Sequence, residues 1–345
     1  MKNGNKVIQD IVRAMLQSGL VDEVVAFGRG GPGGRHILPL WTSDPQDADK
    51  VVTVSFYPSS LAKLVAKYGD KKKKIGMLVR PCDARAVVEL AKRQQINREN
   101  VYLIGIECYG VVREIGSHRE VSVFPEEMQI DGETKPLDEA LLLPNCLRCE
   151  YPLPTMADVS LRIGPGGEVS VTANTEKGKE TLSAAKLTSS EGAQSDISKI
   201  KERAARWQQK DFGELKEMSP GDRLNYWLSQ LDKCIKCYGC RDSCPICTCK
   251  ECYLEPARLL IEGGKVRPEK LFHITRLMHV GDSCVNCGQC EMACPMHIPV
   301  SKLCHMLNKE LSTLFKYEPG LDLNALPPIS TIGDEDLAKT GVDLS

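Results

Sequence analysis

The sequence of 345 residues predicts two domains of different class, an α/β domain with a mostly parallel sheet and a mainly helical domain organised around cysteines. Two observations support this prediction. In about the first third of the chain, segments of helical periodicity alternate with short apolar runs typical of buried strands. In the last third, two cysteine runs have the same internal spacing. We expect the α/β domain at residues 1–190, the helical domain at 196–317 and an extended tail at 318–345.

The α/β domain begins with a helix, because apolar residues recur at helical spacing between positions 6 and 19. The pattern then predicts strands at 24–27, 51–56, 74–79 and 101–106, and helices at 59–68 and 83–93. Beyond Gly116 the chain reads as irregular, until residues 158–175 alternate like a hairpin around a Gly-Pro-Gly-Gly turn. This alternation implies a mostly parallel sheet covered by helices, which places ligands at the carboxyl ends of its strands.

Three glycines after the first predicted strand have the spacing of a phosphate-binding loop, Gly28-x-Gly30-x-x-Gly33. In such a loop the chain continues into a helix whose N-terminus holds the phosphate. Here Pro32 and the non-helical residues 37–39 leave no helix to follow. We therefore interpret the motif as a flexible loop.

The helical domain is preceded by a linker at 188–195, which is rich in Ser, Gly, Ala and Gln. A charged amphipathic helix is expected at 197–209, and two more at 255–261 and 268–279. The tail has prolines and glycines early and acidic residues late, which favours an extended segment that packs on a partner or stays loose.

The two cysteine runs have the spacing with which bacterial ferredoxins bind two 4Fe-4S clusters, C-x2-C-x2-C-x3-C-P. In that arrangement three thiolates of one run hold one cluster, and the fourth holds the other. The expected ligand sets are Cys234, Cys237, Cys240 and Cys294 for one cluster, and Cys284, Cys287, Cys290 and Cys244 for the second. Zinc is the alternative, but it requires neither the third cysteine nor the Cys-Pro of each run. The sequence therefore predicts a mainly helical, ferredoxin-like dicluster domain.

Composition excludes several classes of function. The formal net charge of −1 gives no electrostatic reason to expect nucleic acid or an acidic membrane as partner. No apolar stretch approaches the roughly 18 residues needed for a membrane span. The sequence opens without a secretory signal pattern, so we expect the sixteen cysteines to serve as metal ligands in a reducing cytoplasm.

The first 175 or so residues resemble the beta subunits of coenzyme F420-reducing hydrogenase and of F420-linked formate dehydrogenase. The matching pieces, in order, are residues 19–25, Pro81-Cys82, residues 103–110, and Cys146-Leu147-Arg148-Cys149 followed by residues 157–160. Residues 79–86 and 244–249 also resemble the dicluster beta subunits of sulfhydrogenases and anaerobic sulfite reductases. The resemblance thus extends over almost the whole chain and implies an electron-transfer subunit.

The resemblance implies two further cofactors. One is a third 4Fe-4S cluster held by Cys82, Cys108, Cys146 and Cys149, although isolated cysteines can also be small buried hydrophobic residues. The other is FAD, which would convert a hydride pair into single electrons beside the clusters. Gly4 and Arg80 are the candidate flavin residues: Asn3-Gly4-Asn5-Lys6 stands where the family has Gly-Gly-x-x-Thr, and Arg80 replaces a small residue before Pro-Cys. Arg80 has two alternative roles, in steadying an anionic cluster or in a structural ion pair.

Four cysteines remain, and two interpretations of them stay open. They are Cys247, Cys249, Cys252 and Cys304. They either hold a fourth cluster, or they have another role, which is to shield the neighbouring clusters, to tune potentials through thiol hydrogen bonds, or to join a partner's site.

The sequence contains no nucleophile elbow, P-loop or acid pair, so its catalytic residues are unknown and its chemistry belongs to cofactors. We expect an iron-sulfur electron-transfer subunit of a multi-subunit cytoplasmic oxidoreductase. It would pass electrons between a flavin or hydride-handling site and a hydrogenase, formate dehydrogenase or heterodisulfide reductase-like partner. The alternative is a flavin-free cluster relay and docking scaffold without catalysis of its own.

Overall fold

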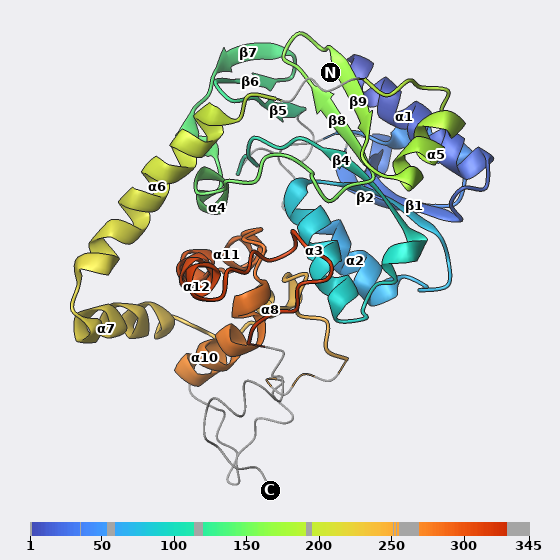
Figure 1. The fold of residues 1–345 in the computed structure, drawn as a ribbon. Coiled ribbons are helices and arrows are strands. Elements are labelled where there is room, and N and C mark those ends of the chain that lie inside the picture. The colour runs from blue at the N-terminus through green and yellow to red at the C-terminus, as the bar shows by residue number, and fades with distance from the viewer. Residues whose placement is uncertain are drawn as a thin grey trace, which may run out of the picture.

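A six-stranded mixed sheet forms the centre of the N-terminal region (Figure 1). The computed structural model describes residues 2–34, 36–53, 59–113, 120–190, 195–250, 252, 254 and 269–329. The strand order is β2-β1-β3-β4-β8-β9, with β1, β3, β4 and β8 parallel and with β2 and β9 antiparallel at the two edges. The strands are β1 (Glu23–Gly30), β2 (His36–Thr42), β3 (Ile75–Val79), β4 (Val101–Ile106), β8 (Val159–Ile163) and β9 (Val169–Ala173).

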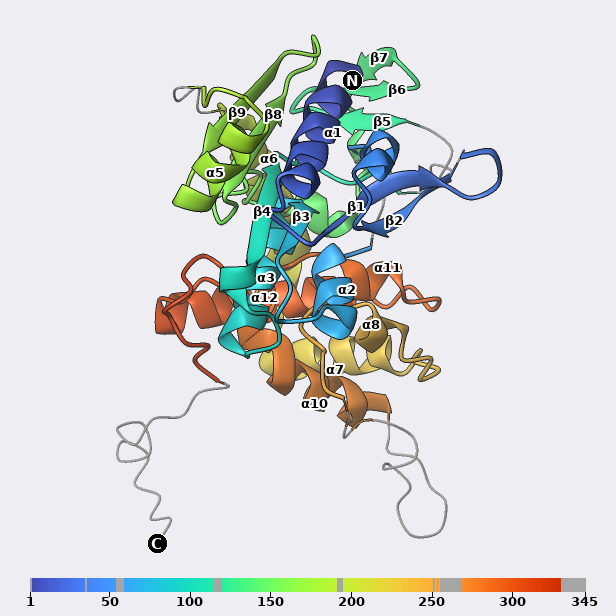
Figure 2. The same ribbon diagram turned by 90° about the vertical axis from the view of Figure 1, so that its right-hand side faces the viewer.

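Helices cover both faces of this sheet (Figure 2). On one face α1 (Lys2–Gln17) and α5 (Glu176–Ala184) pack against Val24, Leu78 and Ile104. On the other face α2 (Leu61–Tyr68) and α3 (Pro81–Lys92) pack against Met77 and Leu103. Since successive strand residues point to opposite faces and both faces are covered, the central strands are apolar throughout.

The first hairpin corrects the interpretation of the glycine motif. Gly28 and Gly30 lie inside β1 and pair with β2, so they do not belong to a flexible loop. The turn proper lies between the two strands, where Gly31 and Gly33 both have φ +71. Val51 bridges to Gly28, but residues 54–56 of the predicted strand at 51–56 lie outside the described residues.

The segment beyond Gly116, which the sequence predicts to be irregular, contains a second, three-stranded antiparallel sheet. Its strands are β5 (Val121–Val123), β6 (Glu127–Ile130) and β7 (Glu133–Pro136). A single helical turn, α4 (Pro144–Leu147), follows and carries Cys146.

The C-terminal region is helical and lies beyond α2 and α3, at one end of the sheet (Figures 1 and 2). Its helices are α6 (Ser198–Glu217), α7 (Pro220–Leu231), α8 (Gly239–Asp242), α10 (Glu269–Val280), α11 (Gln289–Met292) and α12 (Val300–Phe315). The helix predicted at 268–279 corresponds to α10, whereas the one predicted at 255–261 lies outside the described residues. No helix in the described part of the chain is both long enough and apolar enough to cross a membrane.

Buried polar contacts join the two regions. The Arg93 guanidinium donates to Ser283 Oγ at 2.5 Å, and Arg148 Nη2 donates to Ser301 Oγ at 3.1 Å. The first residues after α12 turn back onto α3, where Gly320 N donates to Glu89 Oε1 at 2.7 Å. The helical region is therefore fixed against the side of the sheet from which α3 begins.

Candidate metal centres

The first cavity, called cavity A, is lined by thiols from both cysteine runs. It has a volume of about 320 Å³, and residues of α10 form another part of its wall. The chain turns between successive cysteines because Lys236 and Tyr238 adopt left-handed backbone with φ of 55 and 60. The cysteines that line cavity A are Cys234, Cys237, Cys240 and Cys294. They are the four residues that the ferredoxin spacing assigns to one cluster.

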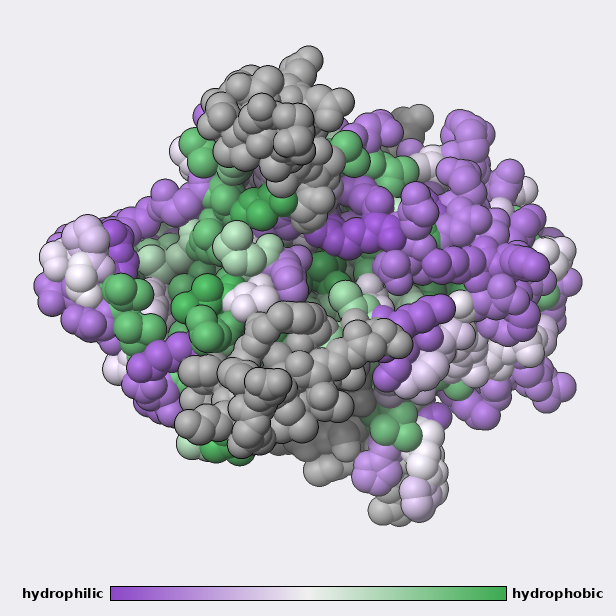
Figure 3. All heavy atoms as spheres, turned by 90° about the horizontal axis from the view of Figure 1, so that it is seen from below, coloured by the Kyte–Doolittle hydropathy of each residue, from purple (hydrophilic) through white to green (hydrophobic). Residues whose placement is uncertain are grey.

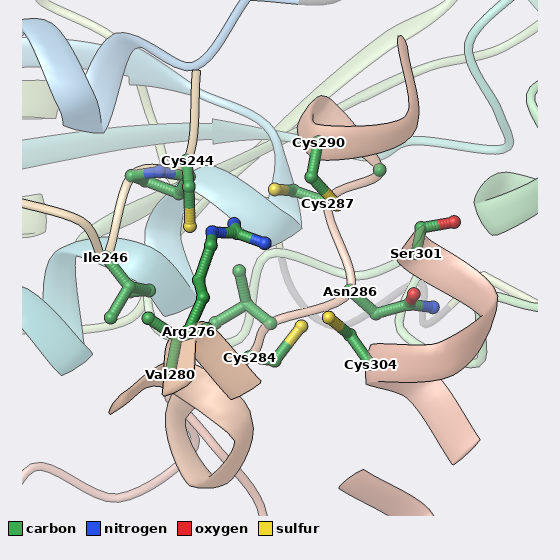
Figure 4. Close-up of a pocket in the computed structure, with 13 residues that line it drawn as sticks. Cys244, Ile246, Arg276, Val280, Cys284, Asn286, Cys287, Cys290, Ser301 and Cys304 are labelled. Atoms are coloured by element: carbon green, nitrogen blue, oxygen red, sulfur yellow. The ribbon is translucent and has the colours of Figure 1, made fainter. Parts of the chain in front are cut away.

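Cavity B has the same construction with the two runs exchanged (Figure 4). Its volume is about 410 Å³. Asn286 and Gly288 take left-handed φ of 54 and 74 at the positions that match Lys236 and Tyr238, so the second run repeats the backbone of the first. The cysteines that line cavity B are Cys244, Cys284, Cys287, Cys290 and Cys304. Four of these form the second predicted ligand set, and Cys304 is an additional thiol.

Neighbouring groups control the protonation of these thiols. Burial raises the pKa of Cys240 to about 11 and that of Cys287 well above its usual value. In contrast, a hydrogen bond from Cys247 holds the pKa of Cys244 well below its usual value, and one from Cys304 lowers the pKa of Cys284. Two thiols outside the predicted ligand sets therefore favour the thiolate form of two thiols inside them.

Cavity C, of about 520 Å³, lies where the central strands of the sheet end. Cys82 follows β3 in the first turn of α3, and Cys108 follows β4. Cys146 on α4 and Cys149 close the ring, so all four thiols assigned by the resemblance line this cavity. Burial raises the pKa of Cys146 to about 12. The carboxyl edge of the sheet thus provides the expected ligand position.

The three cavities form a row. Asn286 and Cys287 line both B and C, so these two cavities share a wall. Arg276 lines B and donates from Nη2 to the carbonyl oxygen of Cys240, a residue of cavity A, at 2.9 Å. Among the described residues, A and C share no lining residue. Cavity B therefore lies between the other two.

The four cysteines left over by the sequence do not line a common cavity. Cys304 lies in cavity B, and Cys247 contacts Cys244 at its edge. Cys252 contacts the Arg241 guanidinium, and Cys249 is exposed. The structure thus places Cys247 and Cys304 beside the ligands proposed for cavity B, and a fourth cluster held by all four cysteines stays a prediction.

Both candidate flavin residues have structural partners. Gly4 lies in α1 so close to β8 that a Cβ on it would be 2.7 Å from Ile163 Cδ1. Arg80 is buried, pairs with Asp83 at 3.0 Å and donates to the carbonyl oxygen of Ser59 at 2.6 Å. Its guanidinium also lines cavity C. Packing and ion pairing therefore account for both residues without a flavin.

Sequence reasoning missed two buried arginines that face the cavities. Arg203 on α6 lines cavity C, and its Nε and Nη1 have no hydrogen-bond partner in the described structure. Arg276 on α10 lines cavity B and has an unpartnered Nε. The available signal was a charged residue on the otherwise buried face of each helix, as Phe272 and Arg276 are four residues apart and both buried.

The described residues contain no group of three or more His, Cys, Asp or Glu side chains close enough to hold a single metal ion. A cubane cluster binds its thiolates at four separate iron corners, which keeps the sulfurs farther apart than the ligands of one ion. Cavities with at least four thiols around their walls fit the larger group, and the unpartnered arginine N–H groups fit its negative charge.

Comparisons with known proteins agree with this geometry. The family profile of the 4Fe-4S dicluster domain matches residues 230–298. The F420-dependent formate dehydrogenase subunit beta of Methanocaldococcus jannaschii is 34% identical, with 93% of each chain covered. The F420-dependent formate dehydrogenase 1 subunit beta of Methanococcus maripaludis is 31% identical, over 92% of this chain and 91% of the relative.

Among solved structures, a chain of the F420-reducing NiFe hydrogenase complex from Methanosarcina barkeri is similar with a TM-score of 0.47 and 18% identity. That match covers 62% of this chain and 86% of the other. The two curated relatives, in contrast, extend over nearly the whole length at more than 30% identity. The chain therefore belongs to the family of F420-dependent formate dehydrogenase beta subunits, the iron-sulfur electron-transfer subunits of oxidoreductase complexes.

Proposed function

We propose that this chain carries electrons through three 4Fe-4S clusters in the order A, B, C. Three cysteine-lined cavities in a row, with Cys287 on the wall between B and C, are the observation that supports this proposal best. The proposed ligands are Cys234, Cys237, Cys240 and Cys294 in A, Cys284, Cys287, Cys290 and Cys244 in B, and Cys82, Cys108, Cys146 and Cys149 in C. Residues 1–190 and 196–317 would act as two domains that meet at the B–C wall, with Pro319 and Gly320 at the start of the tail in contact with α3.

The protein contributes thiolates, charge and exclusion of water. When bound, each cluster accepts and releases one electron at a time. Cys247 and Cys304 donate hydrogen bonds to Cys244 and Cys284, which favours the ligating thiolate form of both. Arg203 and Arg276 supply buried positive charge beside cavities that would contain anionic groups.

The two ends of the row have different surroundings. At cavity A, Cys237 is exposed and so is the adjacent Ile235, whose exposed fraction is 62%. Figure 3, which views the molecule from below, shows apolar residues on the part of the surface formed by the helical region. An exposed apolar area beside a cluster is suited to a partner subunit that exchanges electrons there. Cavity C lies at the sheet edge, where α/β proteins bind their ligands.

The names of the relatives suggest the reaction served. Formate oxidation releases two electrons, and a hydride acceptor such as F420 takes them as a pair. We propose that this chain connects a hydride-handling site near cavity C to the catalytic partner near cavity A, in a reducing cytoplasmic compartment. FAD would join two-electron to one-electron chemistry at the first of these sites. The flavin-free relay remains the second candidate, because Gly4 and Arg80 both have structural partners.

Iron, acid-labile sulfide and flavin per chain, measured on protein purified without oxygen, test the proposal. We expect about twelve irons, and one flavin if the hydride site is part of this chain. About eight irons without flavin would instead support a dicluster relay. Cys146→Ala should lower iron by about four per chain while both remaining clusters stay visible by paramagnetic resonance. Unchanged iron in this variant would remove the cluster from cavity C.

A further inference from the structure

The Arg276 side chain connects cavities A and B. It projects from α10 into the thiol-lined space of cavity B, among Cys244, Cys284 and Cys287 (Figure 4). Its Nη2 donates to the carbonyl oxygen of Cys240 in cavity A at 2.9 Å. One guanidinium is therefore next to residues of both proposed cluster sites.

Among the described residues, Arg276 is buried and has no carboxylate counterion. The residue is 3% exposed, and its Nε has no hydrogen-bond partner in the described structure. Within the described ranges, no carboxylate forms an ion pair with it. His273, one turn earlier on α10, is held neutral because burial lowers its pKa to about 4. The side chains that surround the guanidinium in cavity B include the thiols of Cys244, Cys284 and Cys287.

A buried guanidinium cannot shed its proton to escape this cost. An uncompensated charge in the interior is strongly destabilising, so the fold must supply anions nearby. Clusters ligated by four thiolates carry negative charge, and they gain one more negative charge when they are reduced. A fixed cation between two such sites favours the reduced state of both.

We infer that Arg276 raises the reduction potentials of the clusters in cavities A and B together, whereas cavity C has buried arginines of its own, Arg80 and Arg203. The inference rests on the proposed function, since it requires clusters in A and B. Arg276 acts here as a positioning residue: it holds a charge beside both sites without ligating iron. The reduction potentials of both clusters then depend on the charge of one side chain. This dependence keeps the two adjacent clusters close in potential for electron exchange.

The test is a potentiometric titration followed by paramagnetic resonance on the full chain, purified without oxygen. Arg276→Met should shift the A and B signals to more negative potential and leave the C signal unchanged, with iron content equal to that of the wild type. Arg203→Met is the matched control, because it also removes a buried arginine with unpartnered N–H groups and should shift only the C signal.

A second variant separates charge from folding. Arg276→Lys keeps the charge but loses the planar fork that reaches Cys240, so A and B should stay near their wild-type potentials. The inference is overturned if Arg276→Met has full iron and unchanged potentials, or if all three signals shift equally. The inference is also overturned if Arg276→Lys lowers the reduction potentials of both A and B. This result decides the question even if the Arg276→Met variant does not fold. Wild-type protein without iron in A and B would refute the proposed function instead.

Discussion

Gly288 occupies a position where steric contact, rather than backbone conformation, requires glycine. It has φ +74 in the turn between Cys287 and α11. At the matching position of the first run, Tyr238 adopts φ +60, so a side chain is compatible with this left-handed turn. A Cβ at position 288, however, would lie 2.0 Å from Asn145 Oδ1. Since Asn145 precedes Cys146 on α4, this contact lies between cavities B and C.

The cost of Gly288→Ala can be estimated in two parts. Left-handed backbone costs an alanine about 1–2 kcal/mol. Overpacking against Asn145 adds about 1–3 kcal/mol. The free energy of unfolding should therefore fall by about 2–5 kcal/mol in total. Gly19→Ala isolates the first part, because Gly19 has φ +68 and a Cβ on it would meet no other atom within 4 Å.

A double-mutant cycle with Asn145→Ala measures the second part. This change removes Oδ1, Cγ and Nδ2, the three atoms that would approach a Cβ at position 288 most closely. In the Asn145→Ala background, Gly288→Ala should cost no more than Gly19→Ala costs in the wild type, as measured by chemical unfolding of iron-loaded protein. Coupling of about 1–3 kcal/mol is expected. Additive effects would refute the reasoning, because they would show that position 288 requires glycine for its backbone alone.

Three further variants test the ligand sets and the contact between the two regions. Cys294→Ala should abolish the resonance of the cluster that Cys234 helps to hold, because the fourth cysteine of each run serves the other site; loss confined to the Cys284 cluster would contradict this pairing. Cys304→Ala should keep the wild-type iron content and change only the potential of the cluster in cavity B, whereas a loss of about four irons would make Cys304 a ligand. Glu89→Gln should lower the free energy of unfolding by about 3–5 kcal/mol, because it leaves Lys92 buried without its partner. The exposed Glu176→Gln change should cost less than about 1 kcal/mol in the same unfolding experiment, and equal costs would show that burial of the Glu89 pair has no effect.

The sequence predicted those elements whose signal is long and local. Central strands covered on both faces are apolar throughout, so β3 and β4 could be recognised within a residue or so. The strands β5, β6 and β7 could not, because runs of three or four residues are too short to establish a period of two. The hairpin of β1 and β2 was missed because Gly28 and Gly30 suggested a loop, whereas in a strand they pair like any other residue.

In the candidate site, too, some residues could be predicted from the sequence and others could not. The thiol sets proposed for A and B follow from the spacing of the two cysteine runs, and the set proposed for C follows from four pieces of a resemblance in fixed order. The arginines could not be found in this way, because their partners are distant in sequence. Arg203 donates to the carbonyl oxygen of Tyr109, 94 residues earlier, and Arg276 to that of Cys240, 36 residues earlier. Spacing identifies the ligands of a cluster but not the groups that set its charge environment.

The residues that line cavity B give it a different role from that of cavities A and C. Its thiols come from both cysteine runs, its wall with cavity C contains Cys287, and its link to cavity A is Arg276. Because B is linked to C through Cys287 and to A through Arg276, we expect an electron that crosses the protein through the proposed clusters to pass through B. The extra thiol of Cys304 and the guanidinium of Arg276 both line B, so two of the groups that we expect to tune potential lie at the centre of the row. In a linear relay, a change in the potential of the middle site alters both transfer steps, whereas a change at either end alters only one.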